Sequence, residues 1–189
     1  KTDIGKIESV YCSDTNWFEV TLIINDEEKL VLEIKNSIAG VDLQGLEKLK
    51  NLKKLNCPFD WAIHVDSISD LVQLEELKIL GANVSSLECV KKLNKLKVLN
   101  LRRRQDNDDA FDISEIINLP ELESLCLSCR KITDISYLSE LKNLKELTLG
   151  TCGIENVSVL GNLEKLERLD LFANKKLKNL DVFEKLKNL

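Results

Sequence analysis

The sequence predicts an α/β solenoid, a chain that coils repeatedly and lays down one short strand in each coil. Apolar residues recur at offsets 0, 3, 6, 9, 12, 15 and 17, and the whole ladder returns after 22 residues. A lone amphipathic helix would repeat about every 3.6 residues and a lone strand about every 2, so neither explains this spacing. A series of threes closing in an L-x-L step indicates a coil that turns inward every few residues before a strand. Stacked coils then pair their strands into one parallel sheet over a continuous core.

The ladder is too regular to arise from composition alone. Five complete copies occupy residues 62–79, 84–101, 110–127, 132–149 and 154–171. With 43% hydrophobic residues, seven apolar residues at seven fixed places arise by chance roughly once in 400 trials. Residues 43–57 carry six of the seven positions, and the copy that opens at Ala110 follows a spacing of 26 instead of 22. We therefore expect about seven repeats, interrupted by a four-residue insertion within 102–114.

The segment KITDISYLSELKNLKELTL (131–149) resembles the 22-residue leucine-rich repeats of bacterial internalins and of phosphatase-regulating repeat proteins. The resemblance covers roughly residues 30–189. It implies a curved parallel β-sheet on the concave face and short helical or extended turns on the convex face. It says little about function, because this fold hosts many partners.

The position after each strand departs from the family pattern. Such repeats usually carry Asn three places after the last strand leucine, where its amide bonds to neighbouring backbone. Here Asn174 fits, and the other occupants are Asp60, Ala82, Arg104, Arg130 and Cys152. Cys152 is a familiar substitute in such repeats. Arg104 and Arg130 are too long to lie inside, so we expect the turn to swing outward there.

The N-terminal part predicts a β-hairpin cap. Residues 16–35 alternate apolar and polar side chains on either side of an Asn-Asp-Glu-Glu turn. Leu32 precedes Leu55 by 23 residues, so the second hairpin strand is expected to be the first strand of the repeat sheet. We expect residues 1–35 to cap the core and residues 36–189 to form the solenoid, its last repeat incomplete, within one structural domain. Internalins have a helical cap instead, which weighs against an adhesin role.

Composition excludes several classes of partner. The 32 acids and 27 bases give a net charge of −5 and are mixed along the chain, so no basic face for nucleic acid is expected. No apolar run of about 18 residues predicts membrane insertion, and the first twenty residues lack the zones of a signal peptide. The chain starts at Lys1 without Met, so we expect the natural N-terminus, and any signal peptide removed from it, to lie upstream.

The six cysteines, at 12, 57, 89, 126, 129 and 152, show no spacing typical of a disulfide framework. A chain of 189 residues can bury a core without such cross-links. The composition therefore favours free thiols in a reducing compartment and a cytoplasmic location.

No cluster of residues predicts an enzyme. The single histidine, His64, has no serine, cysteine or carboxylate at triad spacing, and we expect a surface side chain. Cys126 and Cys129 form a CxxC motif near Cys152, but zinc needs a fourth ligand. Residues 106–109 lack the glycine and glutamate of a calcium loop and fit a solvated acidic loop. We therefore expect no cofactor, no metal, no catalytic residue and no small-molecule substrate.

The concave face is the candidate binding site. Side chains between and just after the strand leucines alternate onto it. The predicted partner-binding residues are Trp61, Lys78, Leu80, Asn100, Arg102, Arg103, Arg130, Thr148, Asp170 and Phe172. Exposed apolar side chains with aromatics and arginines are typical of interaction hot spots. An ordinary solvated sheet is the alternative interpretation of the same residues.

These observations predict a protein-binding leucine-rich-repeat module. We expect it to act as a scaffold, or as an inhibitor or regulator of a partner protein, through its concave face. The alternative is a secreted or surface adhesin of the internalin type, binding a host or cell-surface protein.

Overall fold

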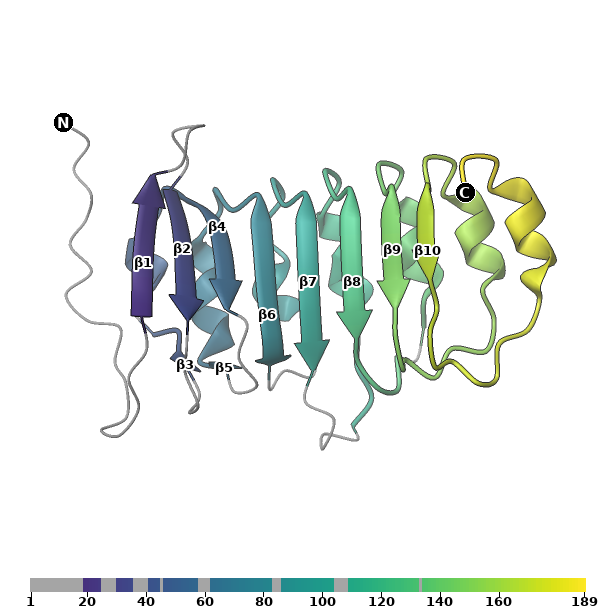
Figure 1. The fold of residues 1–189 in the computed structure, drawn as a ribbon, viewed down its shortest axis with the longest axis horizontal. Coiled ribbons are helices and arrows are strands. Elements are labelled where there is room, and N and C mark those ends of the chain that lie inside the picture. Colours follow the sequence, from purple (N-terminus) through teal and green to yellow (C-terminus); the bar gives the residue numbers. More distant parts are fainter. Residues whose placement is uncertain are drawn as a thin grey trace.

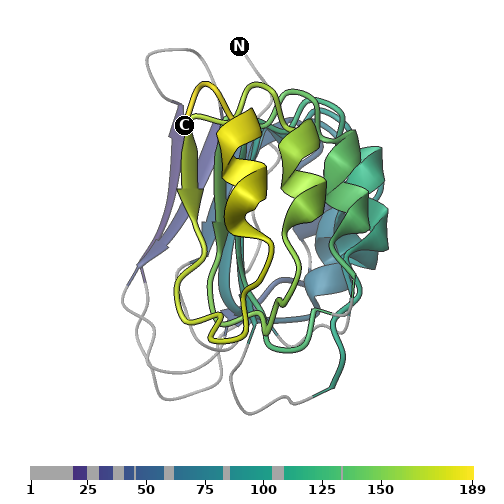
Figure 2. The same cartoon turned by 90° about the vertical axis from the view of Figure 1, so that its right-hand side faces the viewer.

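The computed structural model describes eight stretches of the chain: residues 19–24, 30–35, 41–44, 46–57, 62–82, 86–103, 109–132 and 134–189. These stretches form a sheet with one layer of helical turns behind it (Figures 1 and 2). This arrangement confirms the predicted solenoid.

An eight-stranded sheet runs along the molecule in the order β1-β2-β4-β6-β7-β8-β9-β10 (Figure 1). Its strands are β1 (Glu19–Ile24), β2 (Leu30–Lys35), β4 (Leu52–Cys57), β6 (Glu76–Ala82), β7 (Val98–Arg103), β8 (Ser124–Ser128), β9 (Glu146–Leu149) and β10 (Arg168–Asp170). Strand β1 is antiparallel to β2, and every later pair in this sheet is parallel. Two short parallel strands, β3 (Val41–Asp42) and β5 (Ala62–Ile63), pair separately.

The N-terminal strands pair as the sequence predicts. Strand β2 pairs with β1 on one side and with β4 on the other, and Leu32 lies opposite Leu55. Hence β2 belongs to the hairpin and also starts the parallel sheet. The division at residue 35 into a cap and a solenoid stays a prediction, because residues 36–40 lie outside the described stretches.

Behind the sheet, each coil returns through a short 3₁₀ helix (Figure 2). These helices are η1 (Leu46–Lys48), η2 (Val65–Asp70), η3 (Glu88–Val90), η4 (Ser114–Asn118), η5 (Ser136–Glu140), η6 (Ser158–Asn162) and η7 (Leu180–Lys185). None of the helices in the described part is long and apolar enough to cross a bilayer.

The threefold spacing of the ladder is the hydrogen-bond period of these turns. In the coil around η5, Leu138 N–H donates to Ile135 C=O at 3.0 Å, and Leu141 N–H donates to Leu138 C=O at 3.1 Å. A 3₁₀ helix has about three residues per turn, so side chains three apart lie above one another. Apolar residues at every third position therefore all face the core, and the coil reaches the next strand with its backbone bonded.

The ladder residues form one continuous core. In the copy 132–149, Leu138, Leu144 and Leu149 are each fully buried, and the same core cluster extends from Leu43 to Leu186. The first apolar position predicted for the copy 110–127 is wrong. Ala110 is exposed and the fully buried Phe111 takes its place, because Phe111 N–H donates to Lys131 C=O and this bridge turns its ring inward.

Strands leave the sheet in two ways. At the ends of β6, β9 and β10, the second residue beyond the last apolar residue of the ladder copy (Ile79, Leu149 and Leu171) adopts a left-handed conformation, namely Gly81, Thr151 and Ala173. After β9 and β10 the next residues, Cys152 and Asn174, are buried. After β7 and β8 no left-handed residue occurs at that place, and the extended backbone turns Arg103 and Cys129 inward one position earlier.

Candidate functional site

The concave face presents two rows of side chains, whose positions are fixed by the strand register. The first row runs through Asn56, Lys78, Asn100, Cys126, Thr148 and Asp170, because each of these residues lies opposite the next on neighbouring strands. The second row contains Leu80, Arg102 and Ser128 on paired strands, then Gly150 and Phe172 just beyond β9 and β10. Seven of the ten predicted binding residues therefore lie on one face: Lys78, Leu80, Asn100, Arg102, Thr148, Asp170 and Phe172.

The other three predicted residues do not join these rows. Trp61 lies outside the described residues. Arg130 is exposed beyond the end of β8, as the expected outward turn requires, whereas the corresponding expectation for Arg104 falls on a residue outside the described stretches. Arg103 is a wrong prediction, because its side chain is only 1% exposed and faces the core.

Arg103 enters the core because β7 stays extended to its last residue, which places alternate side chains inside. Its guanidinium lies over the ring of Phe111, with 5.4 Å between Cζ and the ring centroid. Nη1 donates to the Asp109 carbonyl oxygen at 2.6 Å. Nε and Nη2 are buried without a hydrogen-bond partner. No partner protein could reach this side chain, so it belongs to the core and not to the binding face.

One edge of the concave face carries charges that are paired, both within a strand and between neighbouring strands. Glu76 Oε2 accepts Lys54 Nζ at 3.1 Å and Glu76 Oε1 accepts Lys78 Nζ at 2.6 Å. Burial raises the pKa of Glu76, but the hydrogen bonds from these two lysines outweigh it, and the pKa lies below its usual value.

Two further pairs extend this edge. Lys145 pairs with Glu123 at 2.7 Å, and Arg168 pairs with Glu146 at 3.0 Å. A shallow hollow of about 510 Å³ lies between these pairs and is floored by Asn100, Ser124 and Cys126. The charges around the hollow are therefore already neutralised by one another.

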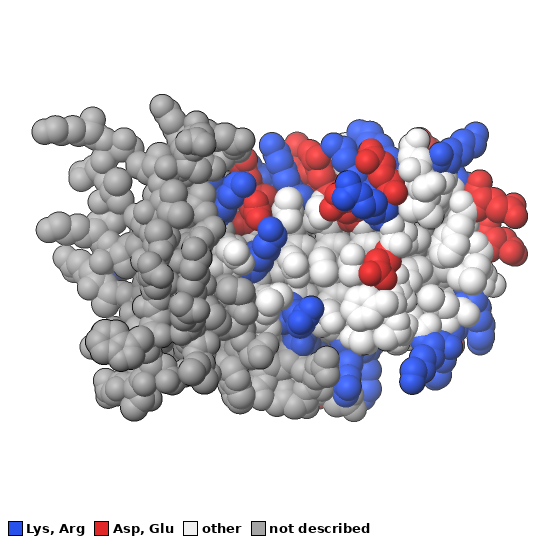
Figure 3. Space-filling model, viewed as in Figure 1, with Lys and Arg blue, Asp and Glu red and all other residues white. Residues whose placement is uncertain are grey.

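Next to this edge lies an uncharged area over β8, β9 and β10 (Figure 3). We define the uncharged patch as Cys126, Ser128, Thr148, Gly150, Thr151 and Phe172. The Thr151 hydroxyl donates to Gly150 C=O at 2.6 Å and can accept the Ser128 hydroxyl, which lies 3.3 Å away. Phe172 is the large apolar side chain of the patch, and it remains 48% exposed.

Phe172 lies directly on Gly150. A Cβ atom built on Gly150 would be 2.0 Å from Cζ of the Phe172 ring, so only glycine leaves room for the ring there. Phe172 C=O accepts Thr151 N–H at 3.0 Å, and Phe172 N–H donates to Asp170 Oδ1 at 2.9 Å. The aromatic ring is therefore held in place and presents its other side to solvent.

The described cysteines, which are 57, 89, 126, 129 and 152, are all free. Burial raises the pKa of Cys89 and Cys129 to about 12 and that of Cys152 to about 11. At neutral pH these thiols stay protonated, and the thiol is a poor nucleophile compared with the thiolate.

The CxxC motif does not gather its two thiols on one face. Cys126 is half-buried on the concave face and Cys129 is buried in the core, since the two residues are an odd number of positions apart on an extended segment. Within the described stretches, no three His, Cys, Asp or Glu side chains are grouped to hold a metal ion.

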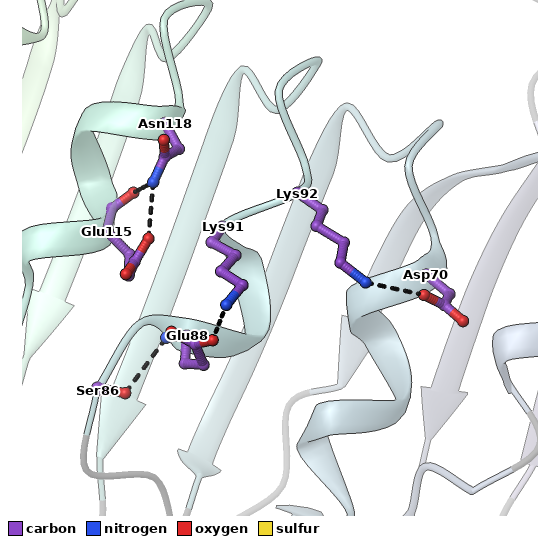
Figure 4. A network of polar contacts seen from close by, with 7 residues as sticks. All are labelled: Asp70, Ser86, Glu88, Lys91, Lys92, Glu115 and Asn118. Carbon is purple, nitrogen blue, oxygen red and sulfur yellow. Dashed lines mark hydrogen bonds and ion pairs between the residues drawn. The ribbon is translucent and has the colours of Figure 1, made fainter.

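The convex side carries its own polar contacts (Figure 4). Lys92 Nζ lies 3.5 Å from Asp70 of the preceding coil, and Lys91 pairs with Glu88. Asn118 Nδ2 donates to Glu115 at 2.7 Å. These are solvent-exposed contacts between long side chains, which contribute little to stability.

No protein-family model matches the sequence, and no curated protein matches it. Solved structures do match. An internalin (InlF) from Listeria monocytogenes superposes with a TM-score of 0.64 at 23% identity, over 83% of this chain and 49% of its own. Internalin C2 from the same organism superposes with a TM-score of 0.67 at 24% identity, over 84% of this chain and 68% of its own. The chain therefore spans about half the length of the first of these relatives.

A third structure, the TLR13–ssRNA13 complex, is similar with a TM-score of 0.58 at 26% identity. The match covers 75% of this chain and 21% of the other. These likenesses establish the fold of the described coils.

Proposed function

Because the chain is a leucine-rich-repeat solenoid with the fold of the internalins, we propose that it binds another protein through its concave face. The proposed role is that of a scaffold, or of an inhibitor or regulator of the bound protein. The observation that carries the proposal is the uncharged patch, with the half-exposed Phe172 ring fixed at its end.

Protein interfaces have a core depleted of charged residues and enriched in aromatic ones, inside a polar rim. The concave face has this arrangement, since the uncharged patch is bordered by ion pairs such as Glu123–Lys145 and Glu146–Arg168. These pairs satisfy each other, so a partner need not neutralise them. The patch also lies on or next to strands bonded along their length, and a rigid surface loses little entropy on binding.

RNA is a second candidate partner, because TLR13, which is similar in fold, is in complex with ssRNA13. RNA binding needs cations along a path for the phosphates. Among the described row residues from β4 to Phe172, the bases are Lys78 and Arg102, and Lys78 is paired with Glu76. The charges therefore favour protein over RNA.

We further propose a cytoplasmic location, supported by five free thiols of which four are buried in the core. The alternative is a secreted or surface adhesin that binds a host or cell-surface protein, which the likeness to internalins supports. Mass spectrometry of the untreated protein after alkylation separates the two, because a stoichiometric disulfide would exclude the cytoplasmic proposal.

Site-specific photo-crosslinking tests the binding face. A photoreactive amino acid is placed at Arg102, beside the uncharged patch, or at Lys142, which is exposed in the coil segment before β9 and serves as the matched control. In extract of the source cell we expect nuclease-resistant protein adducts from position 102 only. Adding Phe172→Ala to the Arg102 variant should reduce them at least about tenfold, since hot-spot truncations cost about 2 kcal/mol or more. Adducts from position 142 alone, or adducts destroyed by ribonuclease, would overturn the proposal.

A further inference from the structure

Two side chains with complementary chemistry meet at the C-terminal end of the uncharged patch. Asp170 closes the first row and Phe172 closes the second, and both are exposed. They belong to the same segment, where the Phe172 N–H bond to Asp170 Oδ1 fixes their relative position. The carboxylate is therefore held at the backbone of the residue that carries the exposed ring.

The Phe172 ring has one side free because Gly150 takes up the other. The face of an aromatic ring carries partial negative charge and attracts a cation placed over it. At 48% exposure the ring is open to a second group from outside. Packing on Gly150 and the backbone hydrogen bonds of Phe172 fix the position of the ring. A cation from a partner would therefore meet a preformed surface.

Asp170 differs from the carboxylates along the charged edge. Glu76, Glu123 and Glu146 each have a lysine or arginine partner. Within the described part of the chain, Asp170 has only the Phe172 N–H, on Oδ1, so Oδ2 is left for an outside donor. Arg168, two positions earlier, is engaged by Glu146.

The nearest base in the second row is Arg102, three strands away on β7. At about 4.8 Å for each strand, this separation is about 14 Å, beyond the screening length of about 8 Å at physiological salt. Arg102 therefore neither pairs with Asp170 nor repels a cation held there. It marks the opposite end of the patch.

We propose that the Phe172 ring and the Asp170 carboxylate together bind an arginine side chain of the partner. This inference rests on the proposed function and names the chemistry that the face recognises. A planar guanidinium stacks on an aromatic ring while its edge donates to a carboxylate, which a lysine ammonium does less well. The net charge of −5 favours a cationic partner over long range.

The test uses amide NMR spectra of the whole chain titrated with Nα-acetyl-arginine-N-methylamide. Its neutral isostere, the citrulline analogue, serves as the matched ligand. We expect arginine, and not citrulline, to shift the amides of Gly150, Thr151, Asp170 and Phe172. The lysine analogue should shift the same amides with weaker affinity.

Three variants assign the interaction. Asp170→Asn keeps the bond to Phe172 N–H and removes the charge, and Phe172→Leu keeps an apolar contact and removes the ring. Each should weaken arginine binding by about threefold to tenfold. Glu164→Gln, an exposed carboxylate away from the concave rows, removes the same charge and should leave binding unchanged. Well-dispersed spectra show that each variant is folded.

Equal shifts with citrulline, unchanged affinity in Asp170→Asn, or no shifts at all would overturn the arginine inference. So would shifts confined to the edge of Glu76, Glu123 and Glu146. Failure here is distinguishable from failure of the proposed function. Protein adducts at position 102 that persist undiminished in Asp170→Asn would retain protein binding and exclude only the arginine contact.

Discussion

Two polar side chains are buried where strands leave the sheet, Arg103 at the end of β7 and Asn174 beyond β10, and their surroundings differ sharply. Asn174 Nδ2 donates to Leu149 C=O at 2.6 Å and to Leu171 C=O at 3.0 Å, while its Oδ1 accepts Ile154 N–H at 3.2 Å. Among the described residues, Arg103 makes one side-chain hydrogen bond, through Nη1, and its other two guanidinium nitrogens are buried without a partner.

The difference follows from the backbone. The left-handed Ala173 turns the chain so that Asn174 points at the free backbone groups of the preceding coil. An amide has both donor and acceptor atoms and can satisfy C=O and N–H groups together. A guanidinium has only donors, and the extended β7 delivers it without the turn that would direct it. A buried polar residue thus stabilises this solenoid only where its donors and acceptors can bond the unpaired backbone N–H and C=O groups around it.

The largest effect is expected from Asn174→Ala. It removes four side-chain hydrogen bonds and leaves Leu149 C=O and Ile154 N–H without the amide that bonds them inside the core. We expect a loss of about 2–4 kcal/mol in the free energy of unfolding, because each buried unsatisfied group costs about 1–3 kcal/mol. Urea denaturation measures it. The exposed neighbour Lys175→Ala is the control and should change stability by less than about 0.5 kcal/mol. Equal stability of both variants would show that the Asn174 network contributes nothing.

A gain in stability is expected from Arg103→Met. Methionine fills a similar path beside Phe111 and removes a buried charge with two orphaned nitrogens, at the cost of the bond to Asp109. Replacing buried charges by apolar side chains is often stabilising by about 1–4 kcal/mol. We expect about 1–2 kcal/mol here, measured as a higher urea midpoint. Arg102→Met, on the exposed neighbour, should leave the midpoint nearly unchanged. A lower midpoint for Arg103→Met would mean that the guanidinium stabilises its coil.

The smallest effect is expected from Cys152→Asn. This substitution tests whether the hydrogen bonds of Asn174 can form at the equivalent position one coil earlier. Cys152 also follows a left-handed residue, Thr151, and its thiol lies 3.6 Å from Leu127 C=O. Ile132 N–H already donates to the Cys152 carbonyl oxygen and is not available to an asparagine Oδ1. An asparagine side chain at this position would therefore gain only a hydrogen bond from its Nδ2 to Leu127 C=O. We expect a change within about 1 kcal/mol. Cys129→Asn, which lacks the preceding left-handed residue, should lose clearly more in the same urea experiment. Equal losses would refute the role assigned to the backbone.

The sequence was sufficient to predict the solenoid, because burial of the ladder depends only on a spacing that matches the 3₁₀ period and the strand alternation. Leu138 and Leu147 are buried as that spacing requires. The rows of the concave face follow from the same alternation, which is why Lys78, Thr148 and Asp170 share one row.

The strand exits could not be predicted, since one residue's choice between left-handed and extended backbone decides which side chain is buried. Thr151 takes the first conformation and Arg103 the second, and neither residue type enforces it. Two signals were nevertheless present. The bulky Phe111 beside the small Ala110 indicates the true rung, and Gly150 opposite Phe172 in the next coil indicates a ring lying on glycine.

Each strand between β2 and β9 bonds only to its immediate neighbours in the sheet, and this gives the molecule a form of adjustable length. Duplicating one 22-residue unit between β8 and β9 would preserve every existing strand-to-strand match except the one it separates. It would also move Asp170 away from Arg102 by one strand spacing, about 4.8 Å. Each duplication or loss of a repeat therefore changes the distance between Arg102 and Asp170 by one strand spacing. The side chains at the two ends of the uncharged patch stay the same.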